Sequence, residues 1–323
     1  MSSLDRAEAR LENLEAIEPL LGSLRVLSLS TMQMALNRQQ SLKEYKARFL
    51  EIARFLRAKE KPPKEKKVTK TALEEDFWDD ADDAWDDDPE NDHDLKEGPK
   101  RNKRILAVIG SSRGICGQYN KQLAHQTARL LEKEAAKAGE IEVLAFGPRL
   151  QNAMRLEEVD FKPGPVLAQG SLPDYERVSK LMRSWEARVN AGKLESVSLL
   201  SFKRLGMRSV YKPKLSRLLP DTGDLLGDLE AQGELFPEPI IEGDPLEILG
   251  RIENHLNAIR LYDLILDAIA AENLYRYRLL EEAKENTESL VDELSVALQM
   301  ERRKAITQQM QQLGVASGML AER

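Results

Sequence analysis

The 323-residue sequence has one cysteine, few aromatic side chains and no long apolar run. Its single cysteine, Cys116, has no partner for an internal disulfide, and three histidines without a second cysteine give no zinc-binding spacing. No stretch reaches the roughly 18 apolar residues that a membrane-spanning helix needs. The first residues are charged and lack the apolar core of a secretory signal. These absences predict a protein of a reducing compartment such as the cytoplasm.

Charge is abundant but unevenly placed. Aromatic residues make up 5% of the chain and charged residues 32%, a balance that favours long helices over a β-sandwich or barrel. The formal net charge is −7. Between Glu74 and Glu97, fourteen acidic residues stand against one lysine, a local charge of −13, which leaves −7 + 13 = +6 for the rest. The sequence therefore describes a mildly basic protein with one acidic insertion.

The acidic insertion belongs to a longer charged segment, residues 59–103, in which basic runs flank the acidic one. Like charges repel, and too little apolar side chain is present to offset the entropy of ordering, so we expect disorder here. The aromatic residues Phe77, Trp78 and Trp85 leave a second interpretation open, in which the strip docks on a basic partner or a neighbouring subunit.

Long helices are predicted at both ends of the chain, over residues 1–58 and 241–323. The carboxyl-terminal one starts near Pro245 and has no glycine or proline between Ile252 and Leu313. No compact domain can bury a helix of that length, so we expect the two helices to pair as a long antiparallel coiled coil. Pro19 predicts a kink or a break in the first helix. The expected seam of the first helix is Leu4, Ala7, Leu11, Leu14, Ile17, Leu21 and Leu24.

Between the helices, residues 104–240 alternate between strand and helix patterns, which predicts an inserted Rossmann-like α/β domain with a small parallel or mixed sheet. A hairpin partner for the third strand is expected near Val210, and a loop over Gly223–Gly233. The predicted strands are Arg104–Gly110, Ile141–Phe146 and Val197–Phe202, and the predicted helices are Asn120–Lys137 and Asp174–Asn190.

The loop from Gly110 to Asn120 follows a strand and opens a helix, a position where phosphate-binding loops occur. It lacks the Lys-Ser/Thr of a P-loop and the glycine spacing of a dinucleotide fingerprint. We therefore expect a structural turn, with Gly114, Cys116, Gly117 and Asn120 as its defining residues. Cys116 has no visible base with an orienting partner, and no carboxylate pair is placed for acid–base work. Catalytic residues, a cofactor and a metal are not predicted.

Four short strings resemble the gamma subunit of F-type rotary ATP synthases, and together they cover most of the chain outside the insertion. The loop Ser112–Asn120 is similar to the family's Ser-Asp-Arg-Gly-Leu-Cys-Gly-Gly-Tyr-Asn. Ser201–Pro220 resembles the family strand that closes with Leu-Leu-Pro, and Glu242–Pro245 resembles its Glu-Pro-Asp-Pro. The most specific string is the carboxyl-terminal signature, matched in type and spacing by Ala271, Glu272, Arg276, Ala283, Asn286, Arg302 and Ala305–Gln308.

The resemblance implies a non-catalytic central-stalk rotor that couples transmembrane ion flow to ATP synthesis or hydrolysis in other subunits. Its implied partners are the alpha and beta subunits of the catalytic hexamer, the epsilon subunit and the c-ring, with no nucleic acid. The implied place is the cytoplasmic face of a bacterial inner membrane, as a peripheral protein, and the ion, H⁺ or Na⁺, is left open. Ile241 and Glu242 would meet the c-ring. The residues that would meet the hexamer are Leu24, Arg276, Arg302, Arg303, Thr307, Gln308 and Gln309.

Several departures from the family pattern indicate a divergent gamma subunit, compatible with the alternate N-type ATPase class. The family's Thr-Gln-Lys-Ile-Thr-Lys-Ala-Met-Lys-Met is replaced by Pro-Leu-Leu-Gly-Ser-Leu-Arg-Val-Leu at Pro19–Leu27. Arg303 stands where glutamine is usual and Gln309 where glutamate is usual. Two alternatives stay open from the residues alone: a coiled-coil adaptor whose acidic strip binds a basic partner, and a nucleotide-dependent enzyme, which the irregular glycine loop disfavours.

Overall fold

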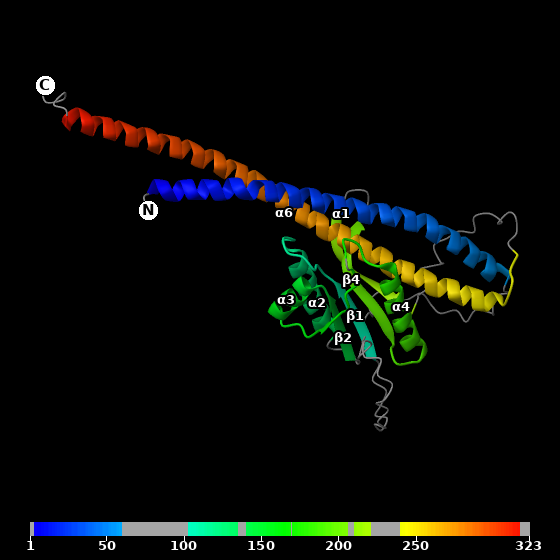
Figure 1. The fold of residues 1–323 in the computed structure, drawn as a ribbon. Helices are drawn as coiled ribbons and strands as arrows, with labels where there is room; N and C mark the ends of the chain where they lie inside the picture. The colour runs from blue at the N-terminus through cyan, green and yellow to red at the C-terminus, as the bar shows by residue number, and fades with distance from the viewer. Residues whose placement is uncertain are drawn as a thin grey trace. The chain divides into compact units, whose positions relative to one another are not determined.

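The computed structural model describes residues 3–59, 103–134, 140–168, 170–205, 210–220 and 240–316. The expected disordered insertion and the Gly223–Gly233 loop lie outside these ranges. The chain forms two compact units, which we call the helical unit (Met1–Leu29 with Arg276–Arg323) and the α/β unit (Ser30–Tyr275). The elements, drawn in Figure 1, are α1 (Ser3–Lys59), β1 (Lys103–Ile109), α2 (Tyr119–Glu134), β2 (Glu140–Phe146), α3 (Pro148–Leu156), β3 (Lys162–Pro163), α4 (Tyr175–Asn190), β4 (Ser196–Leu205), β5 (Val210–Leu219) and α6 (Pro245–Ala316).

The α/β unit is built on a five-stranded sheet with the order β3-β2-β1-β4-β5. The pairs β1–β2, β1–β4 and β2–β3 are parallel, and β4–β5 is an antiparallel hairpin in which Val197 lies opposite Leu219 and Leu205 opposite Val210. β1 is central, and six of its seven residues are buried in a row, as expected for a strand covered on both faces. Figure 1 shows α2 and α3 on one side of the strands and α4 on the other.

Within the α/β unit, α1 and α6 run antiparallel. The side-chain amide of Gln39 donates to the carboxylates of Asp263 and Asp267, both at 3.0 Å, and Arg57 pairs with Glu253 at 2.6 Å. α6 also belongs to the sheet's own core. The Tyr119 hydroxyl of α2 donates to the Ala268 carbonyl at 3.1 Å, so α2 is tied to α6. The core of this unit is therefore shared between the inserted domain and the terminal helices.

The predicted elements are present, with three differences. Helix α1 continues through Pro19 without a break. Pro19 is exposed there, so the carbonyl that loses a backbone donor lies on the solvent side, and the Pro19 carbonyl itself accepts from Ser23 Oγ at 2.9 Å. Helix α3 and strand β3 were not predicted. Gly147-Pro148 marks the end of β2, but Pro148 also starts α3, since proline fits a first helical turn.

The expected seam of α1 is only partly buried in the helical unit. Leu11, Leu14 and Leu21 are half-buried, whereas Ile17 is 44% and Leu24 38% exposed. On α6, Leu280 is fully buried and Leu298 is 5% exposed. Two helices alone cannot enclose every apolar stripe that they carry, because each covers only one side of the other. The helical unit therefore keeps apolar side chains on its surface.

Candidate functional site

The loop between β1 and α2 is held by the side chain of Asn120. Its Oδ1 accepts from the backbone N–H of Ser111 at 2.9 Å, and its Nδ2 donates to Ser111 Oγ at 2.8 Å and to Cys116 Sγ at 3.2 Å. Ser111 Oγ also lies 3.3 Å from Cys116 Sγ. All three residues are buried. The structure thus brings Cys116 and Asn120 together, and the loop closes on its own side chains.

Each glycine of this loop is placed where a side chain would meet a different steric environment. Gly117 has a φ of +53°, in the left-handed region that favours glycine. A Cβ on Gly110 would lie 2.2 Å from the Leu150 Cβ of α3, so the backbone and α3 meet without space between them. Gly114 lies next to the Arg149 side chain. Because the Ser111 N–H is already bonded, the loop offers less to an anion than a phosphate cradle does. These contacts support a structural role for the four predicted loop residues, which stays a prediction.

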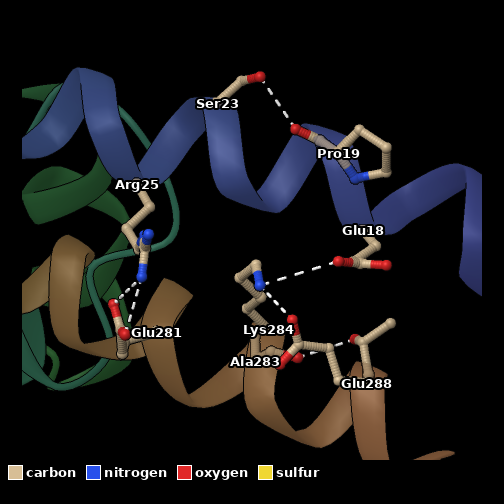
Figure 2. A network of polar contacts seen from close by, with 9 residues as sticks. Glu18, Pro19, Ser23, Arg25, Glu281, Ala283, Lys284 and Glu288 are labelled. Carbon is tan, nitrogen blue, oxygen red and sulfur yellow. Dashed lines mark hydrogen bonds and ion pairs between the residues drawn. The ribbon is translucent and has the colours of Figure 1, made fainter. Parts of the chain in front are cut away.

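Among the described residues of the helical unit, three ion pairs join α1 to α6, and two of them appear in Figure 2. Arg25 Nη1 donates to both carboxylate oxygens of Glu281, at 2.7 and 2.8 Å. Lys284 faces Glu18 at 3.7 Å and also pairs with Glu288 on its own helix. Further along, Arg302 Nη2 donates to Glu8 at 2.7 Å. As the residue number falls along α1 it rises along α6, which establishes the antiparallel order of the helices in this unit.

The electrostatics of these pairs are those of exposed, mutually stabilised charges. The hydrogen bond to Glu281 raises the pKa of Arg25, and the same bond lowers the pKa of Glu281. The hydrogen bond to Glu288 raises the pKa of Lys284. All these groups therefore stay charged at neutral pH. Since their side chains are partly open to solvent, the pairs orient the helices more than they stabilise them.

The predicted hexamer-facing residues lie mainly on the exposed end of α6. Arg302, Arg303, Gln308 and Gln309 are exposed, as is Thr307, whose hydroxyl donates to the Arg303 carbonyl at 2.8 Å. On α1, Leu24 is exposed as well. Arg276 differs, because it is only 7% exposed. Its guanidinium thus has little surface to offer another subunit, whereas the rest of the predicted set is accessible.

Ile241 and Glu242, the two residues predicted to meet the c-ring, lie just before the start of α6. Ile241 is half-buried and packs on a small apolar cluster between α1 and α6 that includes Leu56 and Leu256. Glu242 is exposed, and Gly243 after it has a φ of +116°. Asp244 then caps α6, its carboxylate accepting from the Leu246 N–H at 3.2 Å. Ile241 is thus held by packing while Glu242 faces solvent.

Several polar contacts were not found by sequence reasoning. The ring of His255 lies between two tyrosine hydroxyls, Tyr45 at 3.1 Å and Tyr175 at 3.2 Å. Glu186 of α4 and Asn257 of α6 also meet, both buried. No local signal identifies such pairs, because their members are distant in sequence and belong to different elements.

Other kinds of site find no support among the described residues. No three or more His, Cys, Asp or Glu side chains of these residues are grouped so that they could hold a metal ion. Nor is any helix in the described ranges both long and apolar enough to cross a membrane.

Comparison with known proteins identifies the family of this chain. The sequence model of a family described as ATP synthase matches residues 3–321. The chain belongs to the ATP synthase family. Two relatives, both named ATP synthase gamma chain, are 24% identical to it: the Wolinella succinogenes protein over 62% of this chain and 66% of the relative, and the Ruminococcus albus protein over 67% and 73%. The first match thus spans just under two thirds of that relative's length.

Solved structures from ATP synthases share the fold of this family member. A chain of the Euglena gracilis mitochondrial ATP synthase, from a structure of OSCP, F1 and the c-ring, has a TM-score of 0.57 at 12% identity and covers 99% of this chain and 95% of its own length. A chain from the rotor of the same enzyme has a TM-score of 0.54 at 12% identity, covering 94% and 99%. The resemblance to gamma subunits and the predicted fold class, terminal helices with an inserted α/β domain, are confirmed.

Proposed function

We propose that this ATP synthase family member is a gamma-type central-stalk rotor, a non-catalytic subunit that couples transmembrane ion flow to ATP synthesis or hydrolysis elsewhere. Membership of the family and gamma-chain relatives support this role. The observation that carries it is the end of α6. Every residue from Met300 to Leu313 is exposed, and large apolar side chains stand among glutamines there, with Ile306 55%, Met310 70% and Leu313 69% exposed.

Such a surface suits a shaft that turns inside a sleeve. Exposed apolar groups gain from being enclosed by a partner, and glutamines make adaptable contacts without fixing one angular position by an ion pair. In the proposal, alpha and beta subunits of the catalytic hexamer surround this end, and Leu24, Arg276, Arg302, Arg303, Thr307, Gln308 and Gln309 contribute to the contact. Arg276 would act through the packing of α6, since it is buried.

Torque has to pass along the two helices without sliding. The hydrogen bonds of an α-helix run parallel to its axis, so a helix resists stretching, while the cross-helix pairs Arg25–Glu281 and Arg302–Glu8 oppose a change of register. At the other end, Ile241 and Glu242 would contact the c-ring, with the epsilon subunit beside it. The protein would then be peripheral, on the cytoplasmic face of a bacterial inner membrane. The ion, H⁺ or Na⁺, would be set by the ring. We also propose that the chain divides into the four parts predicted from the sequence, with boundaries after residues 58, 103 and 240.

Truncation after Gln299 tests the rotor role. Among the described residues it removes mainly exposed side chains and two exposed ion pairs, Arg302–Glu8 between the helices and Lys304–Glu301 within α6, so the remaining chain should fold and assemble. Ion uptake into vesicles and ATP hydrolysis are measured together on the assembled complex, with a chain ending at Ala316 as the matched control. We expect ATP hydrolysis without ion uptake in the shorter chain and coupled uptake in the control. If pumping per ATP survives the truncation, the chain bears no torque at this end, and the adaptor role takes its place.

A further inference from the structure

A carboxyl group lies buried where α4 meets α6. Glu186 of α4 is 6% exposed and Asn257 of α6 is 7% exposed, and both belong to the α/β unit. Asn257 Nδ2 donates to Glu186 Oε1 at 3.0 Å. This contact joins the helix that covers one face of the sheet to the long carboxyl-terminal helix. No ion pair to Glu186 is found among the described residues, although a buried carboxylate usually has one.

The side-chain amide oxygen of Asn257, Oδ1, is an unsatisfied acceptor. It is buried and has no hydrogen-bond partner among the described residues. An unsatisfied buried acceptor is costly, and native structures keep few of them. An ionised Glu186 cannot donate a hydrogen bond to this oxygen, because a carboxylate only accepts hydrogen bonds. A protonated carboxyl, in contrast, carries one O–H donor as well as an acceptor oxygen.

We propose that Glu186 is protonated in the folded chain and that its carboxyl forms a two-bond pair with the side-chain amide of Asn257. The amide N–H donates to one carboxyl oxygen, and the carboxyl O–H donates to Oδ1. Both buried polar groups are then satisfied with no charge at the junction. Glu186 and Asn257 are positioning residues, since they hold α4, and with it the sheet, on α6.

The surroundings of Glu186 favour the neutral form. Burial raises the pKa of Glu186 to about 7, while the hydrogen bond from Asn257 and the charge of Arg183 act in the opposite direction. Arg183 lies one turn earlier on α4. On α6, one turn from Asn257, Glu253 is engaged by Arg57, and His255 is bonded to its two tyrosines. The inference goes beyond the rotor role and does not depend on it, because it concerns one junction within the α/β unit.

A raised pKa has a defined consequence for stability. Between the ordinary pKa of a glutamate and about 7, the folded chain would hold a proton that the unfolded chain releases. The contribution of the junction is therefore complete below the ordinary glutamate pKa, decreases as the pH rises from there, and is lost above about 7. Glu186→Gln places a permanent neutral donor and acceptor at the same position and should remove this dependence.

The experiment compares urea unfolding of the full chain with that of Glu186→Gln from about pH 5 to about pH 9. Relative to Glu186→Gln, the unfolding constant of the wild type should rise about tenfold per pH unit up to about pH 7 and then level off. Glu176→Gln, an exposed change on the same helix, is the control and should follow the wild type. A ratio that does not vary with pH, or that falls as pH rises, overturns the proposal.

A spectroscopic measurement keeps the test independent of stability. The infrared carbonyl band of protonated carboxyls should be stronger in the folded wild type and in Glu176→Gln than in Glu186→Gln at about pH 6. Other carboxyls that hold a proton contribute to all three spectra alike, among them Asp267, whose pKa is raised by burial. The excess over Glu186→Gln should fade as the pH is raised through neutrality. No excess of the wild type over Glu186→Gln contradicts a protonated Glu186 even if the unfolding curves shift.

Discussion

Leu298 offers the sharpest test of how the helical unit is held together. Its side chain is 5% exposed, and Leu280 is the other fully enclosed leucine among the described residues of this unit. Replacing a buried leucine by alanine costs about 2–5 kcal/mol, and we expect about 2–3 kcal/mol for Leu298→Ala, because a two-helix layer lets solvent fill the gap. Leu290 lies on the same helix and is 47% exposed, so Leu290→Ala should cost under about 1 kcal/mol.

The assay must report locally, since the helical unit and the α/β unit are separate compact units. Hydrogen exchange of the amides from Leu280 to Met310 meets this need. A loss of about 2–3 kcal/mol corresponds to exchange about 30- to 150-fold faster in Leu298→Ala. Leu298→Asp should go further, as it buries a charge without a partner. If Leu298→Ala accelerates exchange no more than Leu290→Ala does, the seam does not hold the two helices together and the reasoning fails.

Three further predictions address single contacts. Arg25→Glu and Glu281→Arg should each accelerate amide exchange in the helical unit, while the double reversal should restore it in low salt; an unrestored double variant would show that the pair does not set the register. Burial lowers the pKa of His255, so its contribution to stability is present above the ordinary histidine pKa and is lost as pH falls. His255→Gln should therefore weaken the dependence of the urea midpoint on pH in the acid range, and an unchanged dependence there would speak against this. Asn120→Ala leaves the Ser111 N–H buried without an acceptor and should cost about 1–3 kcal/mol in thermal unfolding, against little change for the exposed Asn152→Ala; equal effects would remove the loop's structural role.

Local pattern was sufficient for much of the fold. Central strands read as short apolar runs, and β1, β2 and β4 all begin within one residue of their predicted starts. Helix α3 and strand β3 were missed because the hydrophobic pattern of the sequence is not informative there. β3 has two residues, too few for any periodicity, and α3 buries only Leu150 and Met154 behind a proline that also fits the end of a strand. At Pro19 the sequence predicts a kink or a break, and α1 continues there without a break, because an exposed proline can stay within a helix that other contacts hold.

The sequence by itself determined which side chains are apolar, which are charged and where the longer helices lie, and its short strings were enough to indicate the family. Only the tertiary structure decided which residues meet. Asn257 reaches Glu186 across 71 positions, and Arg25 reaches Glu281 across 256. Periodicity places a residue on one face of its own helix but says nothing about the register of another helix against that face. Partners are chosen when the helices pack, so the buried acid–amide junction and the cross-helix ion pairs became visible only in the folded chain.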